Sequence, residues 1–449
     1  MVEPADNRRI RSQWWFIVLM GLIYTANFAD RTIVSVLGEA IRRDLGLTDL
    51  QLGMMGGLSF ALLYTVMGIP IARIADRHSR IALIAAATGI WSVMTALCGA
   101  AGSFAQLIAC RAGVGIGEAG LTPPLVSLLA DKFATDRRAT AYSLITLGAP
   151  IGGAVAAIAG GYLAQAYGWR IAFVAVGAPG LVLALAVLLT LREPLRQGHV
   201  GGLGVGMAAP AFAAVLRHLG RSPAFLYLTA ASAMVAMVGY ALSLFLVPLL
   251  VRRYGLDLKL AGGVFAITYS LATAIGMISG GLLADRLGQR SVSWFGKAPA
   301  IALCLALPLI IAAVLQADWR GLMALLFVAS MCLYAFLPAI MTVTQRLVPP
   351  DMRASAAALH AFGQTVFGLG LGSVVVGALS DTFTRTAYGP GYTLACSGHA
   401  MQADRCMTAS ATGLQQAILA ISVVLVAAIF CYWRASAALL REIQPSQAM

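Results

Sequence analysis

The feature that most constrains this chain is a series of apolar runs, each long enough to cross a lipid bilayer. A transmembrane helix needs about 20 predominantly apolar residues, and the sequence contains twelve such runs. Only helices and closed barrels satisfy the backbone in hydrocarbon, and these runs lack the alternation of barrel strands. The sequence therefore predicts an all-α polytopic membrane protein. The runs lie at residues 14–38, 50–72, 81–101, 104–130, 139–166, 169–191, 223–251, 259–284, 296–316, 319–345, 353–380 and 413–434.

The distribution of charge predicts which way the chain crosses the membrane. Only 11% of the residues are charged, whereas soluble domains carry about 25%. Lys and Arg gather in the N-terminal tail and in alternate loops, so the positive-inside rule places both termini in the cytoplasm. Topology thus accounts for the net charge of +13, and we expect surrounding membrane lipids and no nucleic acid as partners. The first run is too long for a signal peptide and is expected to remain as a helix.

The chain also repeats itself. The second run is followed by ARIADRHSR and the eighth by GLLADRLGQR, while the fourth is followed by DRRATAYSL and the tenth by DMRASAAAL. Each pair is separated by nearly the same number of residues, which indicates a duplication of six helices. The predicted parts are a cytoplasmic tail at 1–13, bundles at 14–191 and 223–434 in pseudo-symmetry, a cytoplasmic linker at 192–222 with a candidate amphipathic helix, and a tail at 435–449.

These motifs resemble the major facilitator superfamily over essentially the whole chain. An Asp-Arg-x-Gly-x-Arg loop after helices 2 and 8 is typical of that family. The second copy here is complete, whereas the first has Ala72 and Ser79 where the pattern prefers glycine. The loop carboxylate can cap a helix of the other half, and the arginines can pair with acids at helix ends. We expect a cytoplasmic gate made by Asp76, Arg77, Arg80, Asp131, Asp285, Arg286 and Arg290.

Four charged residues fall deep inside the predicted helices, all in the first half. They are Asp30 and Arg31 in the first run and Arg111 and Glu118 in the fourth. A charge facing lipid costs at least about 2.5–3.5 kcal/mol at the bilayer centre, so these side chains must face protein or water. A helix advances 100° per residue, which places Arg111 and Glu118 within about 20° of one face. We expect Asp30 to be the partner of Arg111.

Two interpretations of this cluster compete. A permanent salt-bridge cluster would merely orient helices 1 and 4, but a buried ion pair seldom stabilises a fold better than apolar residues. The equivalent tenth run has Tyr334 and no deep charge, which favours function over architecture. Burial raises the pKa of a carboxyl group and a nearby arginine lowers it. We therefore expect Glu118 and Asp30 to carry protons and Arg111 to be their switchable partner.

The stretches FADRTIVSVL and RAGVGIGEAG resemble the Spinster-like branch of the superfamily. An Asp-Arg pair in helix 1 and an Arg-x-x-x-Gly-x-Gly-Glu-Ala run in helix 4 are typical of that branch. The resemblance reaches the four deep charges position by position. Its animal members transport lysophospholipids or sphingosine phosphate, which implies an amphiphilic, lipid-like substrate for this chain.

The second half offers polar and aromatic residues in place of charges. A mainly apolar half facing a charged half would suit a molecule with a head and a tail. The candidate cavity residues are Asn27, Tyr240, Tyr269, Tyr334, His360 and Gln364. Aromatic side chains in helices also serve packing, and His360 is equally suited to a hydrogen bond between helices.

Other functional classes fit less well. No metal-ligand or nucleophile pattern accompanies the five histidines, so we expect no enzyme, metal or cofactor, and a duplicated chain suits alternating access better than a channel. Efflux of hydrophobic drugs and transport of organic anions remain alternatives, as does sodium coupling. We expect a monomer in a bacterial cytoplasmic (inner) membrane. Cys396 and Cys406 share an outer loop and are either free or joined by a disulfide.

Overall fold

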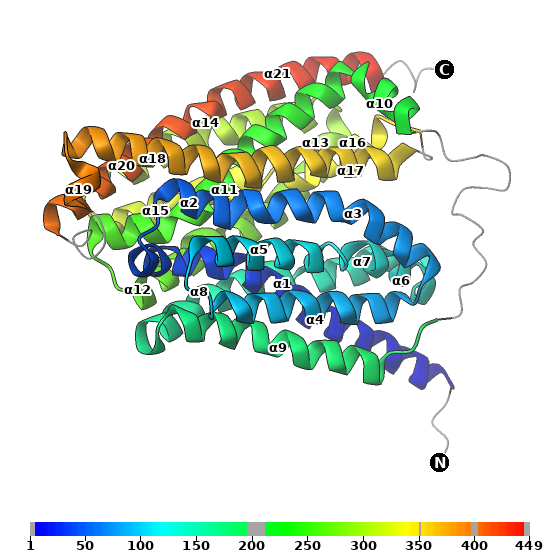
Figure 1. Cartoon of the computed structure of the whole chain (residues 1–449). Helices are drawn as coiled ribbons and strands as arrows, with labels where there is room; N and C mark the ends of the chain where they lie inside the picture. The colour runs from blue at the N-terminus through cyan, green and yellow to red at the C-terminus, as the bar shows by residue number, and fades with distance from the viewer. Residues whose placement is uncertain (1–4, 195–211, 350–351, 397–402, 444–449) are drawn as a thin grey trace. The chain divides into compact units, whose positions relative to one another are not determined.

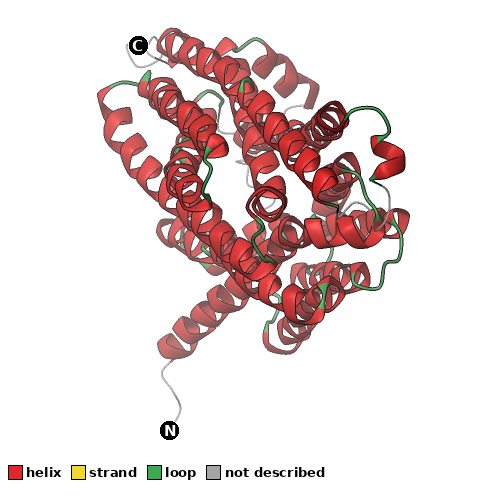
Figure 2. Ribbon diagram, turned by 90° about the vertical axis from the view of Figure 1, so that its left-hand side faces the viewer, coloured by secondary structure: helices red, strands yellow, loops and turns green. Residues whose placement is uncertain are grey.

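The computed structural model describes residues 5–194, 212–349, 352–396 and 403–443. Over these residues all regular structure is helical (Figure 1), and the helices are joined by short loops (Figure 2). Twelve helical stretches are long and apolar enough to cross a membrane. The prediction of twelve spans is therefore confirmed.

The chain divides into two compact units. The first comprises Met1–Gly198 and Leu256–Ala266, and the second His199–Gly255 and Ile267–Met449. The first unit contains α1 (Ala5–Leu45), α2 (Asp49–Gly53), η1 (Met54–Leu58), α3 (Ser59–Arg77), α4 (Arg80–Cys98), α5 (Phe104–Glu118), α6 (Thr122–Lys132), α7 (Thr135–Thr146), α8 (Gly148–Tyr167), α9 (Trp169–Thr190) and α12 (Leu258–Phe265).

The second unit begins with a short helix that falls within the stretch expected to hold an amphipathic helix. It contains α10 (Phe212–Gly220), α11 (Pro223–Tyr254), most of η2 (Ala266–Leu271), α13 (Ala272–Arg290), α14 (Trp294–Leu315), α15 (Trp319–Tyr334), α16 (Leu337–Arg346), α17 (Arg353–Gly363), η4 (Gln364–Leu371), α18 (Gly372–Tyr388), α19 (Tyr392–Ala395), α20 (Asp404–Ser422) and α21 (Val424–Ile443).

Small residues bring the helices of the first unit into backbone contact. Helix α1 packs along α8, and α4 lies between α5 and α9, as Figure 1 shows. A Cβ atom added to Gly152 would lie 2.1 Å from the carbonyl oxygen of Thr25 on α1. Close packing of this kind holds helices together where lipid removes the hydrophobic driving force.

The second unit is built around α11. This helix packs against α21, η4, α20 and α18, and α14 packs against α15 and α21. Glycines again make the closest approaches, because a Cβ added to Gly276 or Gly280 of α13 would collide with the backbone of α15 or its end at Ala335.

The fourth span of each half is broken, whereas the sequence suggested continuous runs at 104–130 and 319–345. Helix α5 ends at Glu118 and α6 begins at Thr122 with proline in its first turn; α15 ends at Tyr334 and α16 begins at Leu337 in the same way. Proline lacks the N–H that would continue the regular hydrogen bonding of the helix, which accounts for the interruption of each span at this point. Broken helices are typical of substrate and ion sites in transporters.

Helix α1 continues further than the predicted run and ends at Leu45, followed by Gly46 with a positive φ of 64°. Glycine accepts this left-handed conformation readily. Glu39 and Arg42 consequently lie inside the helix and are buried, with 1% and 3% exposure. Arg42 Nε lies 3.2 Å from Glu39 Oε2 and 3.9 Å from Asp49 Oδ1. Internal pairing explains why these charges are tolerated there.

Candidate functional site

An ion pair of the first unit joins α1 to the end of α5. Arg31 Nε donates to Glu118 Oε2 at 2.6 Å. The Glu118 side chain has 0% exposure, while that of Arg31 has 26%. Because Glu118 is the last residue before the break in the fourth span, its carboxylate lies where the helix backbone is least regular. The pair thus has one buried member and one member that reaches an open surface.

Aromatic rings surround the guanidinium group of Arg31. Its Cζ lies 5.1 Å from the ring centroid of Phe28, 4.9 Å from that of Phe60 and 5.0 Å from that of Tyr64. A cation over an aromatic face gains about 0.5–2 kcal/mol, more as water is excluded. Arg31 can therefore stay in place when its carboxylate partner is neutral. The sequence analysis did not identify these rings, because aromatic residues in apolar helices usually signal packing.

The neighbouring carboxylate, Asp30, has a different partner from the one expected. Thr95 of α4 donates to it, with Oγ1 2.5 Å from both carboxylate oxygens. Arg111 lies beside Asp30, but its Nη1 donates to the backbone carbonyl of Asp30 at 3.5 Å, and the expected pairing of Arg111 with the carboxylate stays a prediction. Consecutive residues of a helix point about 100° apart, so Asp30 and Arg31 face different neighbours. Glu118 takes the role of ion-pair partner to Arg31.

Two glycines between Arg111 and Glu118 serve the packing of α5. An added Cβ on Gly115 would lie 2.8 Å from the carbonyl oxygen of Phe60, and one on Gly117 would lie 2.8 Å from the backbone nitrogen of Trp91. The space at these positions is therefore filled by α3 and α4. The packing of α5 against α3 and α4 thereby fixes the position of Glu118 relative to α1.

Three buried polar atoms at this site make no hydrogen bond within the described residues. They are Asn27 Nδ2, Arg111 Nε and Glu118 Oε1. Asn27 lies one helical turn before Arg31 on α1 and is 2% exposed. An unsatisfied buried polar group is costly, and these atoms are therefore candidates for contact with a proton, water or substrate group. Asn27 thereby joins the charged cluster, although the sequence placed it only among the cavity candidates.

At one end of the first unit, Arg80 of α4 connects α6 with the segment that follows α9. Its Nη1 donates to Asp131 Oδ2 at 2.6 Å, as expected from the loop motif, and its Nε donates to Glu193 Oε1 at 2.8 Å. Glu193 also accepts hydrogen bonds from Ser79 Oγ at 2.9 Å and from the backbone N–H of Ile81 at 3.0 Å. The sequence analysis missed Glu193, which lies at the edge of the predicted linker.

The other gate candidates are less engaged. Arg77, Asp285, Arg286 and Arg290 are exposed, and none of them forms a salt bridge within the part of the chain that the structure describes. The side chain of Asp76 lies outside the described residues. The role of these five residues in a cytoplasmic gate stays a prediction.

Comparison with known proteins identifies the chain. The family model of the Major Facilitator Superfamily matches residues 20–370. The chain belongs to the major facilitator superfamily. A relative from Mycolicibacterium smegmatis described as an MFS-type efflux pump is 35% identical over 453 residues, which cover 98% of this chain and 96% of that protein.

Within this superfamily the chain is a Spinster-like transporter, as its motifs indicated. Protein spinster of Drosophila melanogaster is 27% identical over 386 residues, covering 84% of this chain and 63% of that protein. A crystal structure of a bacterial homologue of the human lysosomal transporter Spinster, inward-facing and unoccupied, matches with a TM-score of 0.86 and 32% identity, over 96% of this chain and 98% of that one. Its occupied form matches with a TM-score of 0.85.

Apart from Asn27 on α1, the candidate cavity residues form two groups in the second unit. The hydroxyl groups of Tyr269 and Tyr334 are hydrogen-bonded, and Tyr269 also donates to the carbonyl of Gly239 at 3.3 Å; Tyr240 follows directly and is half-buried. Tyr334 precedes the break in the tenth span, as Glu118 precedes that in the fourth.

The second group joins α11 to α17 and η4. His360 is fully buried, and its Nδ1 lies 3.2 Å from Thr229 Oγ1 while its Nε2 lies 3.3 Å from Gln364 Nε2. Both ring nitrogens are therefore occupied by contacts between and within helices. This arrangement matches the packing role considered for His360.

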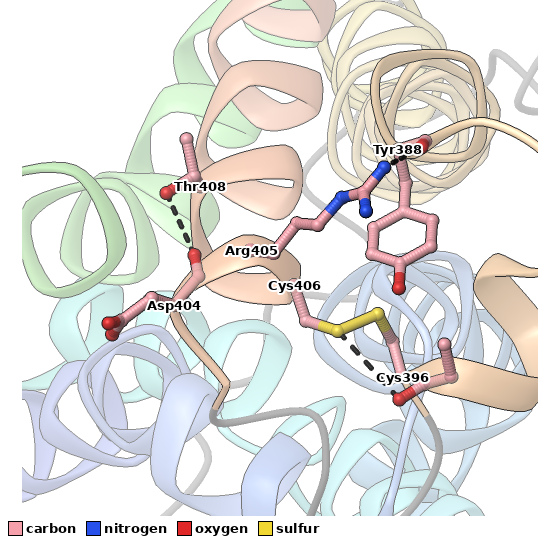
Figure 3. The surroundings of a disulfide bond; sticks show 7 residues. Tyr388, Cys396, Asp404, Arg405, Cys406 and Thr408 are labelled. Carbon is pink, nitrogen blue, oxygen red and sulfur yellow. Dashed lines mark hydrogen bonds between the residues drawn. A yellow bond between two sulfur atoms is a disulfide. The ribbon is translucent and has the colours of Figure 1, made fainter.

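Cys396 and Cys406 form a disulfide in the structure, with their Cα atoms 5.7 Å apart. Figure 3 shows the bond joining the segment after α19 to the first turn of α20, where Arg405 Nη2 donates to the carbonyl of Tyr388 at 3.5 Å. The six residues 397–402 between them lie outside the described part. The bond closes this loop at the end of the second unit.

Proposed function

We propose that the protein is a proton-coupled transporter in which Glu118 carries the proton and Arg31 is its switchable partner. The observation that carries this proposal is the ion pair between a fully buried carboxylate and a partly exposed arginine at the break of the fourth span. Asp30, held by Thr95, is a second candidate carrier. Arg111, which contacts the main chain of Asp30, supplies a fixed positive charge in place of the switching role first expected.

Charge balance gives the coupling mechanism. While Arg31 lies 2.6 Å from Glu118, the ionised carboxylate is favoured because an opposite charge stabilises it. If a change of conformation or an anionic substrate draws Arg31 away, a fully buried carboxylate left alone is disfavoured and takes up a proton. Return of Arg31 then expels the proton toward whichever side is open. Alternating access converts this exchange into proton-driven transport.

The same pair supports an amphiphilic, lipid-like substrate. When Glu118 is protonated, the partly exposed Arg31 is available to hold an anionic head group, and the surrounding rings of Phe28, Phe60 and Tyr64 present apolar surface. The resemblance of FADRTIVSVL and RAGVGIGEAG to the Spinster-like branch, whose animal members transport such lipids, favours a lysophospholipid or sphingoid phosphate. A monomer in a bacterial inner membrane with both termini in the cytoplasm completes the proposal, on the strength of the positive-inside distribution.

A second candidate is proton-driven efflux of hydrophobic drugs. It is favoured by the Mycolicibacterium smegmatis relative, described as an efflux pump and matched over 98% of this chain. The coupling residues would be the same, and only the cargo would differ. Transport of small organic anions is supported more weakly, because the sugar-acid transporters among the relatives match over shorter stretches, such as 44% of this chain.

The decisive experiment measures proton flux in proteoliposomes that contain a trapped pH-sensitive dye. Wild type, Glu118→Gln and the control Asp404→Asn, an exposed carboxylate at the start of α20, are each given a lysophospholipid, a sphingoid phosphate, a cationic drug and a small organic acid. We expect one class to evoke proton flux in wild type and in the control, and none in Glu118→Gln. Equal substrate movement without proton flux in all three proteins would refute the coupling role. Flux evoked by the cationic drug alone would replace the lipid proposal by the efflux candidate.

A further inference from the structure

The short helix α10 is attached to the second unit by its apolar face. Val215 and Leu219 are buried, with 2% and 0% exposure, in a cluster with Phe225, Val348 and Ala356. Its other face is different: Leu216 is 49% exposed, and Arg217 and His218 are exposed beside it. The outward face of α10 therefore combines basic residues with one apolar side chain.

A cavity of about 570 Å³ opens where α10 meets three other elements of the same unit. It is lined by Ala214, Arg217, His218, Arg221, Ser222, Pro223, Arg346, Leu347, Met352, Glu442 and Ile443. Three arginines and one histidine therefore face a space that contains a single carboxylate. None of the three arginines forms a salt bridge within the part of the chain that the structure describes.

The one carboxylate of the cavity is already used. Glu442 Oε2 accepts a hydrogen bond from Ser222 Oγ at 2.5 Å, and its Oε1 accepts one from the backbone N–H of Ala224 at 2.9 Å. Both donors belong to the N-terminus of α11, where a negative charge is favoured by the helix dipole. The charge of Glu442 thus stabilises that helix, and the arginines keep an excess of positive charge in the cavity.

The location of the cavity at the ends of the spans favours a membrane lipid as the source of its ligand. Pro223 is the first residue of an apolar span, and Arg346 and Ile443 are the last residues of two others. We therefore expect the cavity to lie near the head groups, at the ends of these spans, and the leucines at 216 and 226 beside it are each 49% exposed. Basic pockets between membrane helices at this depth suit anionic lipid head groups.

We propose that this cavity binds the phosphate head group of an anionic membrane phospholipid. Arg217 and Arg221 contact the head group from α10 and the turn after it, and Arg346 contacts it from the end of α16. The Cζ atom of Arg346 lies over an aromatic ring, 5.3 Å from the centroid of Phe295, a contact that helps to hold the guanidinium group in position. The site is independent of the proposed transport function, because it uses none of the charged cluster on α1 and α5.

The test compares binding of lipids that differ only in head-group charge. Delipidated protein in detergent is titrated with dioleoyl phosphatidylglycerol, dioleoyl phosphatidylcholine, glycerol 3-phosphate and inorganic phosphate, and bound lipid is counted by native mass spectrometry. The site variant is Arg217→Gln/Arg221→Gln/Arg346→Gln. The control removes three exposed arginines from the other end of the same unit, near the disulfide and the start of α15: Arg320→Gln/Arg385→Gln/Arg405→Gln.

Each basic residue near a membrane surface contributes about five-fold to the binding of an anionic lipid. We therefore expect the site variant to bind phosphatidylglycerol about one hundred-fold more weakly than wild type, and the control to bind it as wild type does. If the triple variant does not fold, Arg217→Glu reverses one exposed charge and should weaken binding about twenty-five-fold. Equal binding of phosphatidylglycerol and phosphatidylcholine, equal loss in site variant and control, or soluble phosphates that bind as tightly as the lipid would each overturn the proposal.

Discussion

Removing Arg31 should destabilise the protein far more than removing its partner Glu118. The Glu118 side chain has 0% exposure and a second oxygen without a hydrogen bond in the described residues. Loss of one member of a buried pair costs about 3–5 kcal/mol, because the other charge stays buried and alone. Protonation of Glu118 limits that cost, so we expect about 3 kcal/mol for Arg31→Met.

The reverse change leaves a charge that is better accommodated. Arg31 is 26% exposed and keeps its three aromatic neighbours, so Glu118→Gln should cost about 1 kcal/mol. The double variant leaves no charge alone and should resemble Glu118→Gln. The two residues would then be coupled by about 2–3 kcal/mol.

The free energy of unfolding is measured by titrating detergent-solubilised protein with SDS and following tryptophan fluorescence at neutral and at acidic pH. Acid should reduce the cost of Arg31→Met, because Glu118 becomes neutral. If Glu118→Gln proves the more destabilising change, or if the double variant costs the sum of the single ones, the asymmetric burial of the pair does not control its energetics.

Three further changes test the surroundings of the site. Burial alone would raise the pKa of Glu193, but its hydrogen bonds from the N–H of residue 81 and from arginine and serine hold the pKa below its usual value; Glu193→Gln should therefore lower the melting temperature at pH 7, and the gap to wild type should close below about pH 4. Gly115→Ala places a Cβ 2.8 Å from the carbonyl of Phe60 and should cost about 1–3 kcal/mol, measured as the free energy of unfolding. Thr95→Val removes the donor to Asp30 and should slow proton uptake in the dye assay without changing the yield of folded protein.

Hydropathy was sufficient to predict the spans, because lipid imposes the same length and composition on every one of them. The sequence also predicted that the four deep charges face protein or water, because a charge at that depth is costly in lipid. The identity of the partner of each charge could not be predicted from the sequence. Asp30 and Arg31 are adjacent in sequence, and a rotation of about 100° decides which of them faces Glu118 and which faces Thr95.

The same reasoning explains why Glu193 and the charges near residue 42 escaped prediction. Both sit at ends of spans, where hydropathy cannot distinguish an exposed charge from one buried by its neighbours. Arg42 is 3% exposed because Glu39 and Asp49 approach it from one helical turn away and from the next helix. Such pairing depends on where α1 ends, and helix ends are the least certain part of a sequence-based prediction.

The duplication shows which features of the broken fourth span belong to the shared fold and which belong to one half alone. Both halves break their fourth span before a proline, so the break belongs to the fold that they share. The residue that precedes it is Glu118 in one half and Tyr334 in the other, and the phenol is satisfied by a neutral hydrogen bond to Tyr269. A helix break therefore needs no charge to be stable. This difference between the halves supports the proposed role of Glu118, because a carboxylate can exchange a proton against the movement of Arg31 and a phenol in a neutral hydrogen bond cannot.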